Sequence, residues 1–247
     1  MRVLTLGMLI AALPLTACHG HGFSADSTPG IKGSGSGDAR SYQVADFTGV
    51  DLRGSDDVTV TTGPGFAVRA EGPSAELDRL KITRVGDTLR IGRINDGGFH
   101  WNSGNHPVKI FVTLPHLAAA SIAGSGDMTV DKVEGANFSG STAGSGNLDV
   151  AAVAVDSVDL SIAGSGDMRL KGVAKQLRID IAGSGGVDAA GLKAQGAKVS
   201  IAGSGNARAD VTGPASVSVM GSGDVDLGAG AKCSTSKMGS GEVRCGG

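Results

Sequence analysis

The stretch SIAGSGDMRL, residues 161–170, is the part of the sequence that decides the fold. Its central Gly-Ser-Gly tripeptide occurs seven times in the second half of the chain, with successive spacings of 20, 20, 19, 20, 18 and 18 residues. Repetition at a nearly constant interval is typical of solenoids, in which each repeat forms one coil that packs against its neighbours. We therefore predict coils of about 20 residues, with tripeptides that begin at Gly124, Gly144, Gly164, Gly183, Gly203, Gly221 and Gly239.

The residues after each tripeptide alternate between apolar and polar positions. A period of two is that of a β-strand with one buried face. The residues before each tripeptide show the same period, so each coil is predicted to be a strand, a Gly-Ser-Gly corner, a strand and a second corner. The apolar positions after the corner are Met128, Leu148, Met168, Val187, Ala207, Val225 and Val243, then Val130, Val150, Leu170, Ala189, Ala209, Leu227 and Cys245. At the second corner we expect a buried plug formed by Val133, Val153, Val173 and Leu192.

A polar column between these apolar positions predicts how the coils stack. From the second repeat it alternates in charge: Asp149, Arg169, Asp188, Arg208, Asp226 and Arg244. In a parallel, in-register stack with coils about 4.8 Å apart, each charge faces an opposite one. Arg208 is thus expected between Asp188 and Asp226. The Asp or Asn that follows most tripeptides is expected to bond local backbone amides as an Asx-turn.

Residues 41–117 are β-rich but irregular, and we place them before the repeats of residues 118–247. Gly54 to Val60 resembles a divergent first coil. Ser74 to Leu80 is expected to form one or two helical turns with Ser74 as N-cap, and Gly86-Asp87 is a hairpin signal. A loop before the strand at residues 108–114 carries Phe99, His100 and Trp101, which either contact a partner or fold back to cap the core.

The N-terminus reads as a targeting segment. Residues 1–17 have a positive start and a short apolar run, and they end next to Cys18 in a pattern that resembles a bacterial lipobox. Cys18 is therefore the predicted lipidation site, and the membrane is the first predicted partner. Residues 18–40 are rich in Gly and Ser and are expected to be a flexible tether. His19 follows the cysteine where enterobacterial lipoproteins retained at the inner membrane have aspartate, and this resemblance favours the outer membrane.

A known family combines these features. The strand residues Val108, Ile110 and Val112, then Pro115 and Leu117, lead into Gly124-Ser125-Gly126-Asp127 behind a lipoprotein-type signal. In this the chain resembles the putative auto-transporter adhesin, head GIN domain family, over roughly residues 41–247. The resemblance implies an all-β fold of stacked coils in an extracytoplasmic setting, and it brings no catalytic residues with it.

Catalytic and metal sites are weakly supported by the residues. Asp224 and Glu242, on adjacent coils, are the best carboxylate pair for an enzyme that cleaves polysaccharides, but turn-capping on a solvated face is the stronger interpretation. The period of about 20 residues differs from that of calcium-binding nonapeptide solenoids. The candidate metal ligands His19, His21, His100, His106 and His116 lack the spacing of a zinc site, and no cofactor is indicated.

The last coil contains Cys233 and Cys245, six residues on either side of Gly239. Both fall in inward-facing columns, and an oxidising compartment favours a disulfide between them. The alternative is two buried thiols.

The composition limits the functions that the chain can have. It has 247 residues, 42 of them glycine, with 3% aromatics and a formal net charge of −2, so a basic nucleic-acid surface is not indicated. The sequence thus predicts an all-β protein: a parallel β-solenoid preceded by an irregular β-rich section, held in the cell envelope. Its expected role is binding, adhesion or structure, with a glycan or an envelope protein as partner. The alternative is a carbohydrate-active enzyme that uses the acidic face.

Overall fold

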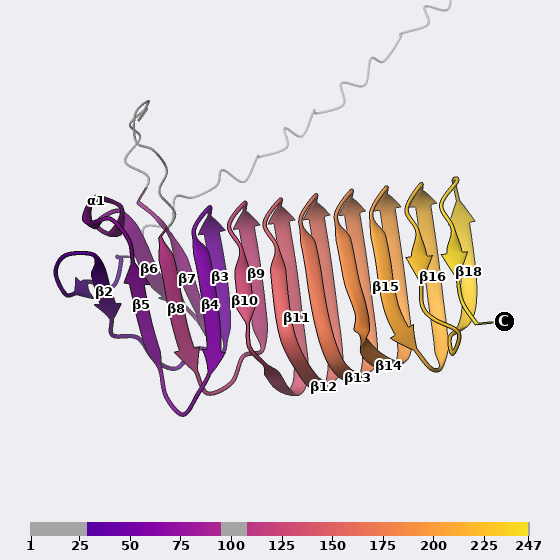
Figure 1. Cartoon of the computed structure of the whole chain (residues 1–247), viewed down its shortest axis with the longest axis horizontal. Helices are drawn as coiled ribbons and strands as arrows, with labels where there is room; N and C mark the ends of the chain where they lie inside the picture. Colours follow the sequence, from indigo (N-terminus) through magenta and orange to yellow (C-terminus); the bar gives the residue numbers. More distant parts are fainter. Residues whose placement is uncertain (1–28, 95–107, 247) are drawn as a thin grey trace, which may run out of the picture.

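The computed structural model describes residues 29–94 and 108–246, and these form a parallel β-solenoid of about six turns behind a β-rich N-terminal section (Figure 1). The first section has one helix, α1(Ser74–Leu77), among the strands β1(Gly33–Ser34), β2(Ala39–Tyr42), β3(Gly49–Gly54), β4(Asp57–Thr62), β5(Ala67–Glu71), β6(Leu80–Val85), β7(Thr88–Arg93) and β8(Lys109–Leu114). The repeats form β9(Ala119–Gly124), β10(Met128–Val130), β11(Val133–Gly144), β12(Leu148–Gly164), β13(Asp167–Gly183), β14(Gly186–Gly203), β15(Asn206–Val211), β16(Pro214–Gly221), β17(Val225–Asp226), β18(Lys232–Met238) and β19(Val243–Arg244). The predicted fold class is confirmed.

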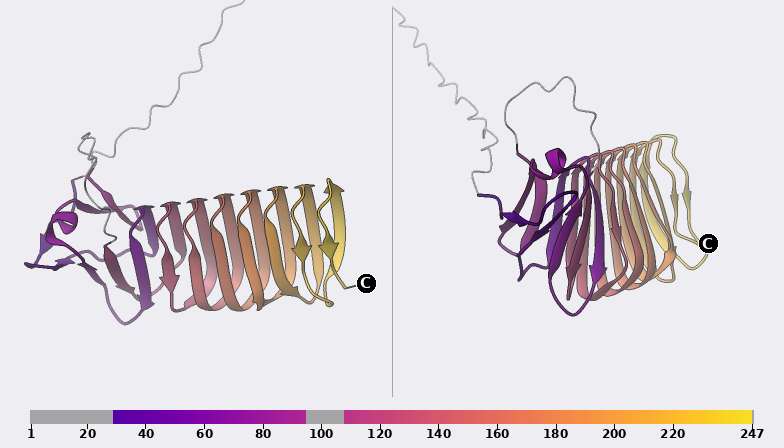
Figure 2. Two further views of the ribbon diagram at one scale, coloured as in Figure 1. Left: turned by 45° about the horizontal axis from the view of Figure 1, so that its top comes forward. Right: turned by 60° about the vertical axis from the view of Figure 1, so that its left-hand side comes forward.

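The coils stack in the predicted register. Strands β9 to β19 pair only in parallel, and the first glycine of each corner lies beside that of the next coil, as for Gly144, Gly164 and Gly183. The apolar columns on both sides of the corner face inward and form one continuous core. In the views of Figure 2 the coils follow one another in a single row, with the C-terminus at the end opposite the helix.

The Gly-Ser-Gly corner requires its two glycines for different reasons. The first, such as Gly164, has a φ of +139°, a conformation that strongly favours glycine. The second, such as Gly166, is needed for space, because a Cβ there would lie 2.1 Å from the carbonyl oxygen of Gly146. The carbonyl oxygen of Gly144 accepts hydrogen bonds from the backbone N–H groups of Ser165 and Gly166, at 2.9 and 3.2 Å. Successive corners are therefore in direct backbone contact.

The second corner takes up every change in coil length. Between β12 and β13 the register shifts after Val150, so Val153 pairs with Gly172 rather than with Val173. Similar shifts occur between β13 and β14 and between β14 and β15. The predicted plug is consequently wrong at one position. Val133, Val153 and Leu192 are buried, but Val173 is 54% exposed because the shorter coil moves it outward.

The first coil is built out of sequence order. As predicted, β3 and β4 form a divergent coil, and they pair in parallel with β9 and β10. On their other side lie β7 and β8, which come later in the chain. The coil of β3 and β4 is thus held between strands that follow it in the sequence. Figure 1 shows β8 on one side of β4 and β10 on the other.

Antiparallel strands close the N-terminal end of the stack. Strand β6 pairs with β7 through the predicted hairpin at Gly86, while β5 pairs with β8 and β2 pairs with β5. Strand β1 in turn pairs with β2, and the N–H of Ile31 donates to Ile82 O at 2.7 Å. Residues 29–40 are therefore part of the folded end, so the expected tether of residues 18–40 is wrong for this portion. The helix also corrects a detail, because Pro73 is its N-cap and Ser74 is its first helical residue.

A buried ion cluster fixes this end. Asp56 is 0% exposed, and it accepts a hydrogen bond from Arg93 Nε at 3.0 Å and one from the Val108 N–H at 3.0 Å. Arg93 also pairs with Glu76 of α1. The hydrogen bond to Asp56 is the main cause that raises the pKa of Arg93. Because Arg93 and Val108 flank residues 94–107, one carboxylate holds the two ends of that segment together.

Candidate binding face

The acidic and amide side chains after the Gly-Ser-Gly corner link one coil to the next. An oxygen of Asp127 accepts the backbone N–H of Asn147 at 2.9 Å, Asn147 accepts that of Asp167 at 3.0 Å, and Asp224 accepts that of Glu242 at 2.8 Å. The predicted local Asx-turns are therefore wrong, because the backbone amides that these side chains satisfy belong to the following coil. We call this column the amide ladder: Asp127, Asn147, Asp167, Gly186, Asn206, Asp224 and Glu242.

The amide ladder has one gap. Asp167 accepts the N–H of Gly186 at 2.8 Å, but Gly186 has no side chain to continue the series. The N–H of Asn206 instead donates to the Gly185 carbonyl oxygen at 3.3 Å. The outward face therefore lacks a ladder side chain at Gly186.

The alternating charges lie in the predicted register, with Arg208 beside Asp188 on one side and Asp226 on the other. The arginine side chains of this column do not all form the same ion pairs. Arg169 approaches Asp149 at 3.5 Å, and Arg244 pairs with Glu242 within its own coil at 2.9 Å. Hydrogen bonds from Arg244 lower the pKa of Glu242.

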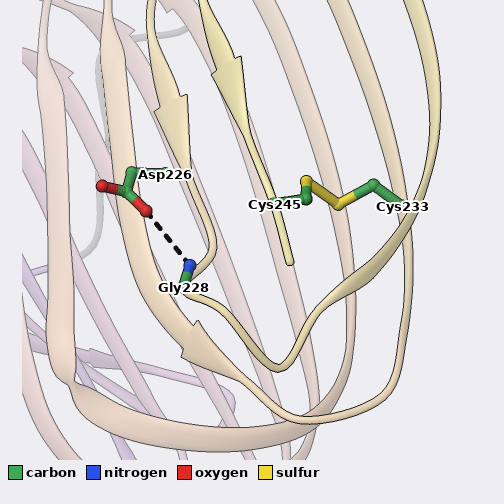
Figure 3. Close-up of a disulfide and its surroundings, with 4 residues drawn as sticks. All are labelled: Asp226, Gly228, Cys233 and Cys245. Carbon is green, nitrogen blue, oxygen red and sulfur yellow. Dashed lines mark hydrogen bonds between the residues drawn. A yellow bond between two sulfur atoms is a disulfide. The ribbon is translucent and has the colours of Figure 1, made fainter. Parts of the chain in front are cut away.

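Arg208 differs from these arginines. Within residues 29–94 and 108–246 its guanidinium makes no hydrogen bond or ion pair. Its register neighbours bond backbone amides instead: Asp188 accepts the N–H of Ala190 at 3.3 Å, and Asp226 accepts that of Gly228 at 3.1 Å. Figure 3 shows the Asp226 carboxylate directed at Gly228. Arg208 therefore lies between the two aspartates, as predicted, but forms an ion pair with neither.

Two shallow depressions adjoin Arg208. One, of about 320 Å³, extends over the coils of Asn206, Asp224 and Glu242, and the other, of about 230 Å³, over those of Asp167, Gly186 and Asn206. Each has Arg208 in its wall, and no aromatic residue is among the described side chains that line them. Such a surface can form many hydrogen bonds, but it offers no stacking platform.

Asp224 and Glu242, the acidic pair of the enzyme hypothesis, make contacts that stabilise the coils. Asp224 is bonded to the backbone of the next coil, and Glu242 is held by Arg244. A catalytic acid needs a raised pKa, whereas that of Glu242 is lowered. The pKa shift of Glu242 is thus opposite to the one that a catalytic acid requires.

The other predicted site residues are distributed as follows. Cys18, the triplet Phe99, His100 and Trp101, and the histidines at 19, 21, 100 and 106 lie outside the described residues. Among the residues that the structure describes, no group of three or more His, Cys, Asp or Glu could hold a metal ion. In the same part of the chain, no helix is long and apolar enough to cross a membrane.

Cys233 and Cys245 form a disulfide in the last coil, with their Cα atoms 6.2 Å apart (Figure 3). Both residues are half-buried against the core. Cys233 pairs in register with Ala215 of the preceding coil.

A cavity of about 520 Å³ lies at the closed N-terminal end. Its apolar lining includes Ile31, Leu77 and Leu80, and its polar lining includes Lys32 and the ion pair of Arg40 with Asp78. Burial raises the pKa of Tyr42 in its wall. Sequence reasoning missed this cavity because residues 29–40 were assigned to the tether.

The fold and this face define a class of protein: a parallel β-solenoid with a regular polar face. The putative auto-transporter adhesin, head GIN domain family matches residues 46–231, and the chain belongs to that family. No curated protein sequence matches the chain significantly.

Solved structures are similar in fold. A putative adhesin from Bacteroides fragilis is 23% identical with a TM-score of 0.78, over 87% of this chain and 100% of that one. A putative lipid binding protein from Parabacteroides distasonis is 24% identical with a TM-score of 0.68, over 86% of this chain and 98% of the other. A putative adhesin from the same organism is 21% identical with a TM-score of 0.64, over 87% and 99%. At these identities the likeness establishes the shared architecture.

Proposed function

We propose that this protein is a lipid-anchored binding module of the cell envelope, and that its outward polar face binds a repetitive ligand such as a glycan. The observation that carries the proposal is the regular face itself. Its hydrogen-bonding side chains recur from coil to coil, about 4.8 Å apart, with one gap in the amide ladder at Gly186, so it suits a ligand that also repeats. Membership of an adhesin family agrees with a binding role.

The anchor would attach at Cys18, after removal of residues 1–17, and an outer-membrane location follows from His19 by resemblance. Residues 18–28 would then link the lipid to the folded end at Pro29. The long axis of the solenoid places its C-terminal coils far from that end (Figure 1). In this arrangement the face with the depressions is held away from the anchor. The triplet Phe99, His100 and Trp101 is proposed as a second contact with a partner.

The ligand class can be tested with a glycan array. The mature chain with Cys18→Ala should bind selected glycans, while an envelope protein recovered by crosslinking, with no glycan bound, would redirect the proposal to a protein partner. Absence of both would overturn the binding role.

The anchor has its own prediction. Cys18→Ala should abolish incorporation of a radiolabelled fatty acid and release the protein from membranes, because the thiol at this position is the atom that is acylated. Cys233→Ala serves as the control and should keep the label. Label retained on Cys18→Ala would end the lipoprotein interpretation.

A further inference from the structure

The unpaired Arg208 guanidinium is the feature of the polar face that best marks a ligand site. Asp188 and Asp226 flank Arg208 in register, but each carboxylate is turned toward a backbone amide of its own coil and neither pairs with Arg208. Five N–H donors in a planar fork are therefore presented to whatever enters the adjoining depressions.

Acceptors and donors surround this fork. Asn206 uses its Oδ1 to accept the N–H of Asp224 at 3.0 Å, which leaves its side-chain amide N–H groups available. Carboxylates can accept several hydrogen bonds each, so Asp188, Asp224 and Asp226 keep free acceptor positions. Closely interspersed donors and acceptors match vicinal hydroxyl groups, which both donate and accept.

The charge of the site selects against anionic ligands. Five carboxylates and three guanidinium groups line the two depressions together. One guanidinium is already neutralised by Glu242. The excess of negative charge makes a polyanion unfavourable, and the interspersed donors and acceptors fit the hydroxyl groups of a neutral polyol.

The spacing indicates a chain that runs along the solenoid axis. One depression is centred on the coil of Gly186 and the other on the coil of Asp224, with the coil of Arg208 between them. Two coils are about 9.6 Å apart, close to the length of one disaccharide unit of an extended glycan. Gly186, which has no side chain, lies in the wall of the smaller depression.

We infer that Arg208 is the central binding residue of a subsite for a neutral, extended carbohydrate chain, whose consecutive disaccharide units occupy the two depressions. This inference rests on the proposed glycan-binding function and names its ligand class and location. Without an aromatic platform each contact is weak, and binding strength would come from several coils, or several molecules, acting together.

The test uses the mature chain with Cys18→Ala and measures the affinity for cellohexaose, chitohexaose and, as the anionic probe, hexagalacturonate. Arg208→Ala should weaken binding of a neutral hexamer at least tenfold with no change in melting temperature. Arg178→Ala is the matched control, because Arg178 is exposed on the strand before the corner, where it pairs with Asp180 at 2.7 Å. It should bind like the parent chain.

A second variant fills the site without removing charge. Gly186→Asn should add the missing member of the amide ladder and occupy the floor of the smaller depression. The backbone at Gly186 is outside the left-handed region, and the nearest atom to an added Cβ is a side-chain oxygen of Asp167 at 3.0 Å. We expect an unchanged or higher melting temperature and at least threefold weaker binding of the neutral hexamer.

The outcomes separate the two proposals. If a neutral hexamer binds and Arg208→Ala binds it equally well, the subsite is wrong while the glycan-binding function stands. If hexagalacturonate binds more tightly than both neutral probes, the ligand class is wrong. If the parent chain binds none of the three and no glycan on the array, the proposed function fails together with the subsite.

Discussion

Thr142 is the residue at which the apolar columns of the solenoid are interrupted. It pairs in register with Ile122 on one side and Ile162 on the other, and it is buried like them. Among the described residues its hydroxyl oxygen has no hydrogen-bond partner. In the same coil Phe138 is fully buried, and its ring and the side chains of Leu148 and Leu160 lie within 4 Å of the place where Gly140 would carry a Cβ, so the hydroxyl of Thr142 lies in an apolar core.

Replacing this hydroxyl should stabilise the protein. Thr142→Val keeps the shape and removes a buried polar group that lacks a partner, so we expect the free energy of unfolding to rise by about 1–2 kcal/mol. Urea denaturation followed by circular dichroism measures it. Thr129→Val, at an exposed position, should change stability by less than about 0.5 kcal/mol. A loss of stability in Thr142→Val would mean that the hydroxyl is bonded after all.

The coil is the next scale, and its Gly-Ser-Gly corner determines how coils meet. The second glycine of each corner is buried, and the backbone of the preceding coil occupies the place of its missing side chain. Asp56 occupies this position in the first coil, where its side chain accepts hydrogen bonds from Arg93 and Val108. A side chain at the second-glycine position is therefore tolerated only in the first coil, where no preceding Gly-Ser-Gly corner packs against it.

A corner substitution tests this contact. Gly166→Ala should lower the free energy of unfolding by about 3 kcal/mol, because the added Cβ overlaps the Gly146 carbonyl oxygen and the coils must separate. The matched control is Gly65→Ala, since Gly65 is exposed and nothing lies within 4 Å of an added Cβ. Thermal unfolding of both variants gives the comparison. Equal melting temperatures would show that the corners are not in close contact.

Much of the coil could be predicted from the sequence, because strand periodicity and the alternating charges both depend on neighbours that recur at fixed spacing. The exposure of Val173 could not be predicted, because it depends on where a coil shortened by one residue loses that residue. Likewise, an Asp after the corner looks the same whether it bonds its own turn or the next coil. For Arg208, the register was predictable, but the orientation of its aspartate neighbours toward the amides of Ala190 and Gly228 was not, because it depends on the local backbone after each Asp.

At the scale of the whole molecule, the two ends of the stack are finished differently. The N-terminal end is covered by antiparallel strands and locked by Asp56 and Arg93. The order of strands there was not predictable, because β3 and β4 pair on both sides with strands that lie far along the chain. The C-terminal end is the edge strand β18, nearly all of it exposed, including Met238 at 71%.

The disulfide should compensate for this exposed edge. Removing it with Cys233→Ser and Cys245→Ser should loosen the last coil by about 3 kcal/mol, the loop-closure contribution of a crosslink over 12 residues. Hydrogen exchange should accelerate in residues 232–246 and stay unchanged in β12 and β13. An unprotected edge also favours association, so the double variant should oligomerise more readily. Non-reducing peptide mapping of the parent chain should recover the two cysteine fragments joined, and recovery of free thiols would remove the basis of this prediction.

The uneven behaviour of the two corners has a practical consequence. Coil length varies only at the second corner, as between Val150 and Val153, while the glycine corner keeps its contacts throughout. Foreign peptides grafted into the second corner should therefore be displayed in a row at intervals of about 4.8 Å without disturbing the stack. The glycine corner is thus the fixed side of the solenoid, and the second corner is the side that should accept insertions.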